Sequence, residues 1–219
     1  MTHIFFDVDG VLINWFHANP AVRNRWDKYV KQDLGIDPEV MSTRFFGGPF
    51  LDVIVGRRDL VEALEEFMPQ LGYHGPVQTF IDYWFQNDAV VNHSVLNVAK
   101  KLSKIDGVHL YIATNQEKYR AKYLWEAAGF KDHFKDIYYS GKLGVIKHDP
   151  TYFRKINQEL GLTSDHTVLF FDDDPKNVAA AQNQGWKAFV FEKEEDLLEN
   201  EFIRRILKPL QASGRGNLS

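Results

Sequence analysis

The sequence predicts an α/β fold with a parallel β-sheet at its centre. From residue 94 onward, short apolar runs rich in β-branched and aromatic residues alternate with helical patterns, as in sheets whose parallel strands are joined by crossover helices. One further apolar run stands alone at the N-terminus, and residues 14–93, which follow it, show helical patterns and no convincing buried strand. We therefore expect a three-layer, Rossmann-like core that is interrupted by an all-helical insert.

The predicted core comprises residues 1–13 and 94–219. Its first strand begins at His3 and delivers Asp7 and Asp9 at its end, and further strands are expected at residues 108–113, 136–139, 167–171 and 186–191. Helices are expected between them, with Ser94 as the N-cap of the first, at residues 94–105, 117–128, 150–161, 175–184 and 194–207. The stretch 140–149 is expected to be a loop.

Residues 14–93 are predicted to form a helical cap domain inserted after the first strand. Pro20 and Pro38 each follow a residue that favours the helix N-cap, Asn19 and Asp37, which is the order expected at a helix start. Aromatic residues at helical spacing are frequent in this region. They more often indicate packed helices than a ligand site, so we interpret them as the apolar core of the insert.

The composition excludes several classes of protein. The chain has 219 residues, of which 44% are hydrophobic, and its net charge of −4 comes without a basic stripe, which argues against nucleic-acid binding. It has no cysteine, so a disulfide scaffold, a thiolate zinc site and a cysteine nucleophile are excluded. Because no apolar run approaches about 18 residues and no signal-like segment opens the chain, we expect a cytoplasmic protein that does not engage a membrane.

Two carboxylates end the first predicted strand. Asp7 and Asp9 are one residue apart, so they point the same way from an extended chain, and Gly10 lets the chain turn away at an angle that other residues resist. Carboxylates forced together repel each other unless a cation or a shared proton relieves the repulsion. The rest of the chain is expected to supply that relief.

Polar side chains also follow the other strands. Thr114 and Asn115 come after the second strand, Lys142 and Lys147 lie in the loop after the third, and the fourth ends in two acidic residues, Asp172 and Asp173. Because ligands of open parallel sheets bind at the carboxyl ends of the strands, we expect these groups to share one rim.

Four stretches of the sequence resemble the motifs of the haloacid dehalogenase-like (HAD) hydrolase superfamily, in the family order. Residues 7–12 resemble its first motif, residues 113–115 its second, and residues 170–177 its acidic fourth motif. Residues 147–150 resemble the third, usually written Lys-Pro-Asp-Pro, with His148 in place of the first proline. The helical insert stands where the family carries its type-one cap, and the resemblance covers essentially the whole chain.

The resemblance implies a role for each matching residue. Asp7 would be the nucleophile that forms an aspartyl-phosphate, and Asp9 would be the general acid and then the base that activates water. Thr114 and the backbone N–H of Asn115 would hold the phosphoryl oxygens. Lys147 would neutralise charge on the phosphate and on Asp7.

The same resemblance implies a Mg²⁺ site. Its ligands would be Asp7, the backbone carbonyl of Asp9 and Asp173, with Asp172 either direct or just behind them. Hard oxygen ligands without cysteine or a histidine cluster favour Mg²⁺ over zinc. Such an ion would make the clustered carboxylates tolerable.

Several other residues compete for these roles. Lys147 is favoured over Lys142 as the phosphate-binding lysine because of the Asp-Pro that follows it, and Asp149 and Asp174, each before a proline, are best explained as N-caps. In the insert, three arginines could meet a substrate anion, although a surface role is favoured for each: Arg44, Arg57 and Arg58. Trp15 and Phe16 could line the entrance but are favoured as packing at the passage between core and insert.

The function implied is that of a Mg²⁺-dependent phosphatase of small phosphorylated metabolites, monomeric or homodimeric. A phosphosugar mutase resembling β-phosphoglucomutase would use the same phosphoenzyme, and a haloacid dehalogenase is disfavoured because that branch uses no second aspartate at the position of Asp9. A phospho-accepting receiver or non-catalytic phospho-binding module is disfavoured because a receiver has its acidic pair before its acceptor aspartate. An EF-hand calcium loop would need ligands where Phe5 and Phe16 stand.

Overall fold

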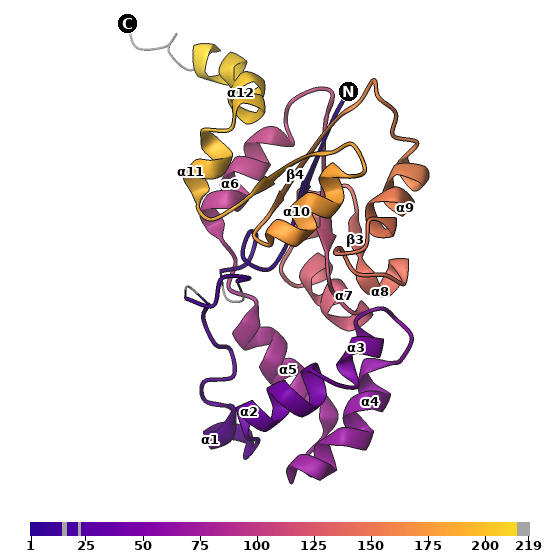
Figure 1. Ribbon diagram of the computed structural model, residues 1–219. Coiled ribbons are helices and arrows are strands. Elements are labelled where there is room, and N and C mark those ends of the chain that lie inside the picture. Colours follow the sequence, from indigo (N-terminus) through magenta and orange to yellow (C-terminus); the bar gives the residue numbers. More distant parts are fainter. Residues whose placement is uncertain (15–16, 22, 214–219) are drawn as a thin grey trace, which may run out of the picture.

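The computed structural model describes residues 1–14, 17–21 and 23–213, and it contains a five-stranded parallel sheet (Figure 1). The strand order is β3-β2-β1-β4-β5. The strands are β1 (Thr2–Phe6), β2 (Val108–Thr114), β3 (Ile137–Tyr139), β4 (Thr167–Asp172) and β5 (Lys187–Val190). The α/β fold class is therefore confirmed, and each predicted strand is found near its expected position.

The central strand β1 fixes the register of the sheet. Phe5 lies opposite Tyr111 of β2 and Phe170 of β4, and it is fully buried. Phe5 faces one layer of helices while Ile4 and Phe6 face the other, because successive side chains of a strand point to opposite sides. Burial on both faces explains why β1 is continuously apolar.

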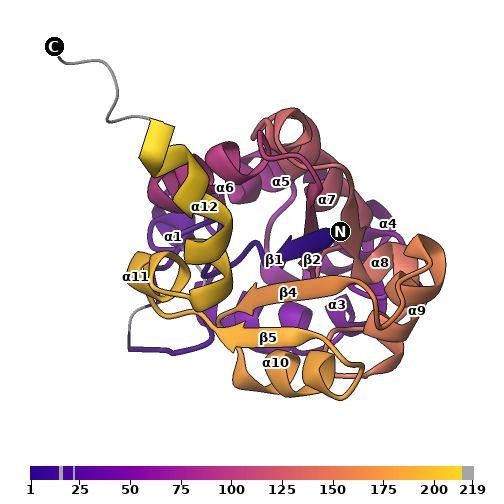
Figure 2. The same cartoon turned by 90° about the horizontal axis from the view of Figure 1, so that it is seen from above.

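Helices cover both faces of the sheet (Figure 2). One face packs against α6 (His93–Leu102), α7 (Lys118–Glu126), α11 (Glu194–Leu198) and α12 (Glu201–Ser213). The other face packs against α8 (Ser140–Leu143), α9 (Thr151–Leu160) and α10 (Pro175–Gln182). Among the described residues, no helix combines the length and the apolar character needed to cross a lipid bilayer.

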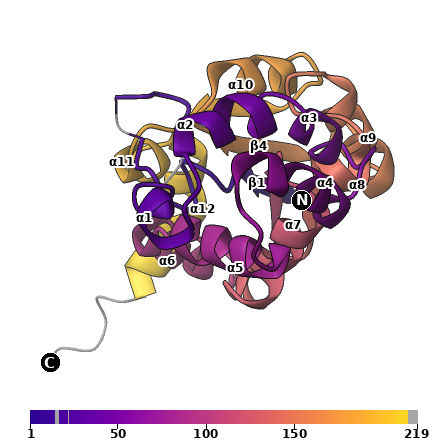
Figure 3. The same ribbon diagram turned by 90° about the horizontal axis from the view of Figure 1, so that it is seen from below.

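A group of helices lies beyond the carboxyl ends of the strands, as the view from below shows (Figure 3). They are α1 (Val30–Leu34), α2 (Pro38–Val40), the π-helix η1 (Met41–Phe46), α3 (Phe50–Val53), α4 (Leu60–Phe67), the 3₁₀ turn η2 (Met68–Leu71) and α5 (Val77–Asp88). We call residues 30–88 the helical segment. It packs around an apolar cluster of its own, in which Phe45, Leu64 and Phe80 are fully buried.

The chain leaves the core and returns to it along two adjacent stretches. The backbone N–H of Asn14 donates to the carbonyl of Val90, and the N–H of Asn92 donates to the carbonyl of Leu12. Asn92 also accepts from the N–H of Val95 through its side chain, so Asn92, and not Ser94, is the N-cap of α6.

The structure differs from the sequence expectation in three further elements. No helix starts at Pro20, because the Asn19 side chain accepts from the N–H of Ala21 and closes a turn. A short helix, α8, occupies part of the expected loop 140–149, and the expected final helix is divided into α11 and α12. Asp37 does cap α2, where it accepts from the N–H groups of Glu39 and Val40.

Candidate active site

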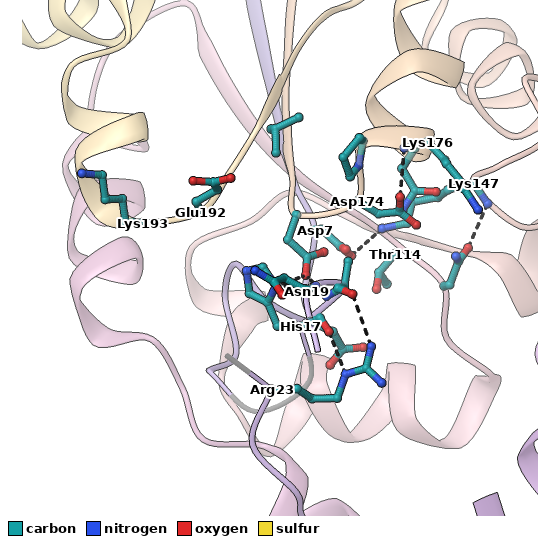
Figure 4. Close-up of a pocket in the computed structure, with 17 residues that line it drawn as sticks. Asp7, His17, Asn19, Arg23, Thr114, Lys147, Asp174, Lys176, Glu192 and Lys193 are labelled. Carbon is teal, nitrogen blue, oxygen red and sulfur yellow. Dashed lines mark hydrogen bonds and ion pairs between the residues drawn. The ribbon is translucent and has the colours of Figure 1, made fainter. Parts of the chain in front are cut away.

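The predicted site residues meet at the carboxyl edge of the sheet, around a cavity of about 870 Å³ (Figure 4). Strands β1, β2 and β4 end side by side, so the residues that follow them share one rim. The cavity wall contains Asp7, Asp9, Thr114, Asn115, Lys147 and Asp173. Asp172 is fully buried and lies behind this wall.

Lys147 is enclosed between two carboxylates. Its Nζ lies 2.6 Å from Oδ1 of Asp7 and 2.7 Å from Oδ2 of Asp172, and the lysine is only 1% exposed. Burial alone would lower the pKa of Lys147, but the two carboxylates outweigh it and raise that pKa above its usual value. The ammonium is therefore a fixed positive charge at the bottom of the cavity.

Asp7 uses one carboxylate oxygen, Oδ1, for the ion pair with Lys147, and the other, Oδ2, is left for the cavity. Its Oδ1 accepts from the N–H of Val8 as well as from Lys147, whereas no donor among the described residues reaches Oδ2. Burial raises the pKa of the Asp7 carboxyl; Lys147 opposes this shift, while Asp172 and Asp173 add to it. A positive charge beside Oδ2 would hold Asp7 ionised.

Asp172 is surrounded by donors. Besides Lys147, its oxygens accept from the Nδ2 of Asn177 and from the N–H of Asp174. Both oxygens of Asp172 therefore already hold protein partners, and its clearest observed contact is the one that holds Lys147 in place.

Three buried carboxylates form a group that could hold a metal ion. Asp7, Asp172 and Asp173 each offer one oxygen, and these oxygens lie within 4.8 Å of one another. The ammonium of Lys147 contacts two of these carboxylates, so the group carries an excess of two negative charges over this ammonium when all three carboxyls are ionised. The pKa of Asp173 is raised to about 7, because the effect of burial outweighs that of the hydrogen bond from Ala18, which lowers the pKa. A hard divalent cation fits both the oxygen donors and this excess charge.

Gly10 is required by the approach of Asp173. The residue has a φ of 78°, in the left-handed region, and a Cβ placed there would overlap the Asp173 carboxylate. The sequence expectation that Gly10 makes a special turn is confirmed, and the structure adds its reason: the turn brings a second acidic strand end against the first.

Asn115 and Thr114 lie at the end of β2. The Asn115 side chain accepts from the backbone N–H of Lys147 at 2.9 Å, which fixes the loop that carries the lysine. Thr114 is 1% exposed, and the only hydrogen bond recorded for its hydroxyl within the described chain is a long 3.5 Å contact with Gln116. Both residues stand within reach of the same cavity as Asp7.

Asp9 is bound by two residues that the sequence reasoning missed. Its Oδ1 lies 2.8 Å from the NH2 of Arg120, and its Oδ2 accepts from the Nε2 of Gln116 at 2.6 Å. Gln116 directly follows Asn115 and Arg120 comes one helical turn later, so their nearness to the second motif was the only signal available.

A segment preceding the helical segment also reaches the site. The N–H of Ala18 donates to Oδ2 of Asp173, and Nδ1 of His17 lies 3.4 Å from the same oxygen. Arg23 donates from Nε to the carbonyl of His17. Trp15 and Phe16, which the sequence singled out at this passage, lie outside the described residues.

The competing residues have other partners. Lys142 is paired with Glu159 at 3.3 Å, and it does not line the cavity. Asp174 accepts from the N–H of Lys176 and is the N-cap of α10, as expected. Asp149 accepts from the N–H of Thr151, but the N-cap of α9 is Pro150, so the expectation that Asp149 is an N-cap is wrong by one position. His148, which stands at the unusual position of the third motif, contacts Asp174 at 2.8 Å.

The three arginines that the sequence singled out in the insert, Arg44, Arg57 and Arg58, have partners outside the site. Arg57 is paired with Asp52, Arg58 is paired with Glu66, and Arg44 lies over the ring of Phe67. None of the three arginines lines the cavity described above.

Comparison with known proteins places these observations in a family. The family model described as haloacid dehalogenase-like hydrolase matches residues 1–185. No curated protein matches the chain.

Solved structures of similar fold come from several bacteria. A HAD family enzyme from Bacteroides thetaiotaomicron, solved as a magnesium complex, has a TM-score of 0.70 at 21% identity, over 87% of this chain and 93% of that one. A predicted HAD-like family hydrolase from Porphyromonas gingivalis has a TM-score of 0.68 at 21% identity, over 96% and 98%. L-2-haloacid dehalogenase from Xanthobacter autotrophicus, with chloropropionic acid covalently bound, has a TM-score of 0.58 at 18% identity, over 96% and 87%. At these identities the likeness establishes the fold.

Proposed function

The chain belongs to the haloacid dehalogenase-like family of hydrolases, and we propose that it hydrolyses phosphoric monoesters of small metabolites in a Mg²⁺-dependent reaction. The observation that carries this proposal is the pair Asp7 and Asp9 on the wall of one cavity, opposite a buried lysine. A nucleophile and a separate acid/base are what two-step phosphoryl transfer needs. Asp9 also disfavours the dehalogenase branch, which uses no second aspartate at this position.

The first step would transfer the phosphoryl group to Asp7. Oδ2 of Asp7 attacks phosphorus, the bond to the leaving oxygen breaks, and Asp9 gives that oxygen a proton. Lys147 and the hydroxyl of Thr114 hold the phosphoryl oxygens as charge develops on them, and no reorganisation of the buried lysine is needed at that moment.

The second step would return Asp7 to its starting state. Asp9, now ionised, takes a proton from water, the water oxygen attacks phosphorus, and the bond between Asp7 and phosphorus breaks to release inorganic phosphate. The proton that Asp9 gave in the first step is thereby recovered.

A Mg²⁺ ion would be held by Asp7, Asp173 and the backbone carbonyl of Asp9, with Asp172 beside them. When bound, the ion supplies positive charge at the oxygens of the transferring group. The chemistry of the donor set supports this assignment, since all the candidate ligands are oxygens. The magnesium complex of the Bacteroides thetaiotaomicron enzyme, which shares the fold, is consistent with it.

The helical segment is proposed to act as a cap over the site. It touches the core at several points, among them the hydroxyl of Ser140, which donates to the carbonyl of Ile54, and the ion pair between Lys118 and Asp59. A cover of this kind excludes water while the phosphoryl group is transferred and contributes contacts to the rest of the substrate.

The proposal is tested by measuring phosphate release from a panel of phosphorylated metabolites and 4-nitrophenyl phosphate, with Mg²⁺ or with EDTA. We expect release that requires Mg²⁺ and that is lost in Asp7→Asn, a variant that keeps the size of the side chain. Release that persists in this variant would overturn the mechanism. Isomerisation of sugar phosphates without release of phosphate would identify a mutase instead.

A further inference from the structure

The carboxylate of Asp9 is held at both of its oxygens. Arg120 donates to Oδ1, Gln116 donates to Oδ2, and the Oε1 of Gln116 accepts in turn from the Nε of Arg120 at 3.0 Å. The three side chains therefore form a closed ring of hydrogen bonds. Because every member of the ring restrains the other two, the orientation of Asp9 is tightly determined.

A fourth residue reaches this ring from the helical segment. Asp88, the last residue of α5, lies with Oδ2 2.6 Å from the NH1 of Arg120, and the same oxygen accepts from the Nε1 of Trp84. Arg120 is 2% exposed and Asp88 is 6% exposed. The buried guanidinium therefore lies between two carboxylates, that of Asp9 from the core and that of Asp88 from the helical segment.

The second carboxylate is more than the packing of Arg120 requires. Asp9 already offers the guanidinium a close counter-charge, and burying a further charged group is costly unless its interactions repay the lost hydration. The lost hydration of Asp88 is only partly compensated, because its Oδ1 is buried with no hydrogen-bond partner among the described residues. The ion pair with Asp88 does connect the guanidinium, and through it Asp9, to the helical segment, although NH1 of Arg120 has no hydrogen-bond partner among the described residues.

Asp9 stands where two cavities meet. It lines the cavity that contains Asp7, and it also lines a second cavity of about 510 Å³, whose wall includes Gln116, Arg120 and Asp88. The rest of this wall is mixed. Polar and charged residues such as Arg25, Asp27 and Glu39 line it beside four aromatic residues from the helical segment and the stretch just before it: Trp26, Phe46, Phe50 and Trp84. A phosphate ester attacked at Asp7 would place its leaving group on the far side of Asp9, in this second cavity.

We propose that Gln116, Arg120 and Asp88 are positioning residues that orient the Asp9 carboxylate toward the leaving oxygen. Through Asp88, this orientation depends on the position of the helical segment. The inference rests on the proposed function, because it assigns supports to the acid/base of that reaction. None of the three residues needs to touch the phosphoryl group. Their effect is confined to the transfer of a proton between Asp9 and the leaving oxygen.

Proton transfer can be isolated by varying the leaving group alone. Aryl phosphates with 4-nitro, unsubstituted and 4-methoxy rings have similar shapes, but the 4-nitrophenolate leaving group is much less basic than the other two phenolates. A weakly basic phenolate departs without a proton, whereas a strongly basic one depends on the general acid, whose contribution is about 10²–10⁴-fold. We therefore compare kcat/KM across this series for the wild type, Asp88→Asn and Arg120→Lys.

For both variants we expect kcat/KM to fall about tenfold or more on the 4-methoxyphenyl ester and less than about threefold on the 4-nitrophenyl ester. Asp88→Asn keeps the size of the side chain and removes its charge, so it should fold even if Arg120→Lys does not. Asp82→Asn, on the exposed face of the same helix, is the matched control and should match the wild type on every ester.

Equal losses on all three esters would mean that the residues only support the fold, and unchanged rates in both variants would mean that they do not act on Asp9; either result overturns the proposal. The proposed function fails separately. If the wild type releases no phosphate from any of the esters in an Asp7-dependent way, the hydrolytic mechanism is overturned together with the inference that rests on it.

Discussion

The ammonium of Lys147 lies 2.6 Å from Oδ1 of Asp7, although the two residues are far apart in the sequence. Both are buried, so neither charge is screened by water as it would be at the surface. In such surroundings the loss of one partner leaves an uncompensated charge, and that is far more costly than the loss of a surface ion pair. The pair therefore links the stability of the core to the chemistry of the site.

Replacing Lys147 with methionine should damage both properties. The substitution removes the charge that faces Asp7 and Asp172, so we expect the free energy of unfolding to fall by roughly 3 kcal/mol or more, and phosphate release to fall by about 10²-fold or more. Denaturant unfolding and phosphate release at saturating Mg²⁺ measure the two effects.

Lys142→Met is the matched control, because Lys142 is half-exposed and pairs with Glu159 and Asp136 at the surface. It should change the free energy of unfolding by less than about 1 kcal/mol and leave phosphate release unchanged. If Lys142→Met lost activity and Lys147→Met kept it, the choice between the two lysines made from the sequence would be wrong.

The meeting of Asp7, Thr114, Lys147 and Asp173 could be predicted from the sequence because the topology alone requires it. Asp7 and Asp173 directly follow strands with a strong apolar pattern, Thr114 ends another such strand, and Lys147 lies in the stretch after the third. The carboxyl ends of parallel strands lie at one edge of the sheet. The order of the motifs then specifies which strand carries which group.

The contact between Asp88 and Arg120 could not be predicted in this way. Each residue occupies an ordinary position on an amphipathic helix, and the two helices belong to different parts of the chain. Their contact depends on how the helical segment docks on the core, and no local pattern encodes a docking angle. The false helix start at Pro20 has a simpler cause: Asn19 favours a turn as readily as an N-cap, and propensity alone does not separate the two.

Alanine at Gly10 should cost more than the left-handed backbone alone explains. The φ of 78° predicts a cost of about 1–2 kcal/mol, and the overlap with Asp173 predicts a further ~1–3 kcal/mol together with weaker Mg²⁺ binding. Gly35 has a similar φ of 73° and nothing within 4 Å of its added Cβ, so Gly35→Ala should show the backbone cost only. Equal losses in the two variants, measured by denaturant unfolding, would show that the contact with Asp173 is unimportant.

Mg²⁺ should stabilise the folded protein. If the ion binds the acidic group of the folded chain and not the unfolded chain, a concentration of about 100 times its Kd raises the free energy of unfolding by about 2.7 kcal/mol. Thermal unfolding with Mg²⁺ and with EDTA measures this shift, which we expect to be lost in Asp173→Asn. Asp174→Asn should retain it, because asparagine still caps α10 and Asp174 is outside the acidic group. A shift of the same size in both variants would contradict the metal site.

His3 should make the fold sensitive to acid at a place remote from the site. Its ring is 5% exposed and stacks on His109, and neither ring nitrogen has a hydrogen-bond partner among the described residues. Burial, together with the positive charge that the nearby His109 and His166 can carry, lowers the pKa of His3 to about 4. Below about pH 6.5, His3 therefore binds a proton in the unfolded chain but stays neutral in the folded chain. The free energy of unfolding should decrease as the pH falls from 7 to 4, and His3 should account for up to roughly 3 kcal/mol of this decrease. Denaturant unfolding across this range should show a smaller decrease in the free energy of unfolding for His3→Phe than for the wild type. His74→Phe is the control: its side chain is exposed, so it should show the same decrease as the wild type. The same pH dependence in His3→Phe and the wild type would contradict the assignment.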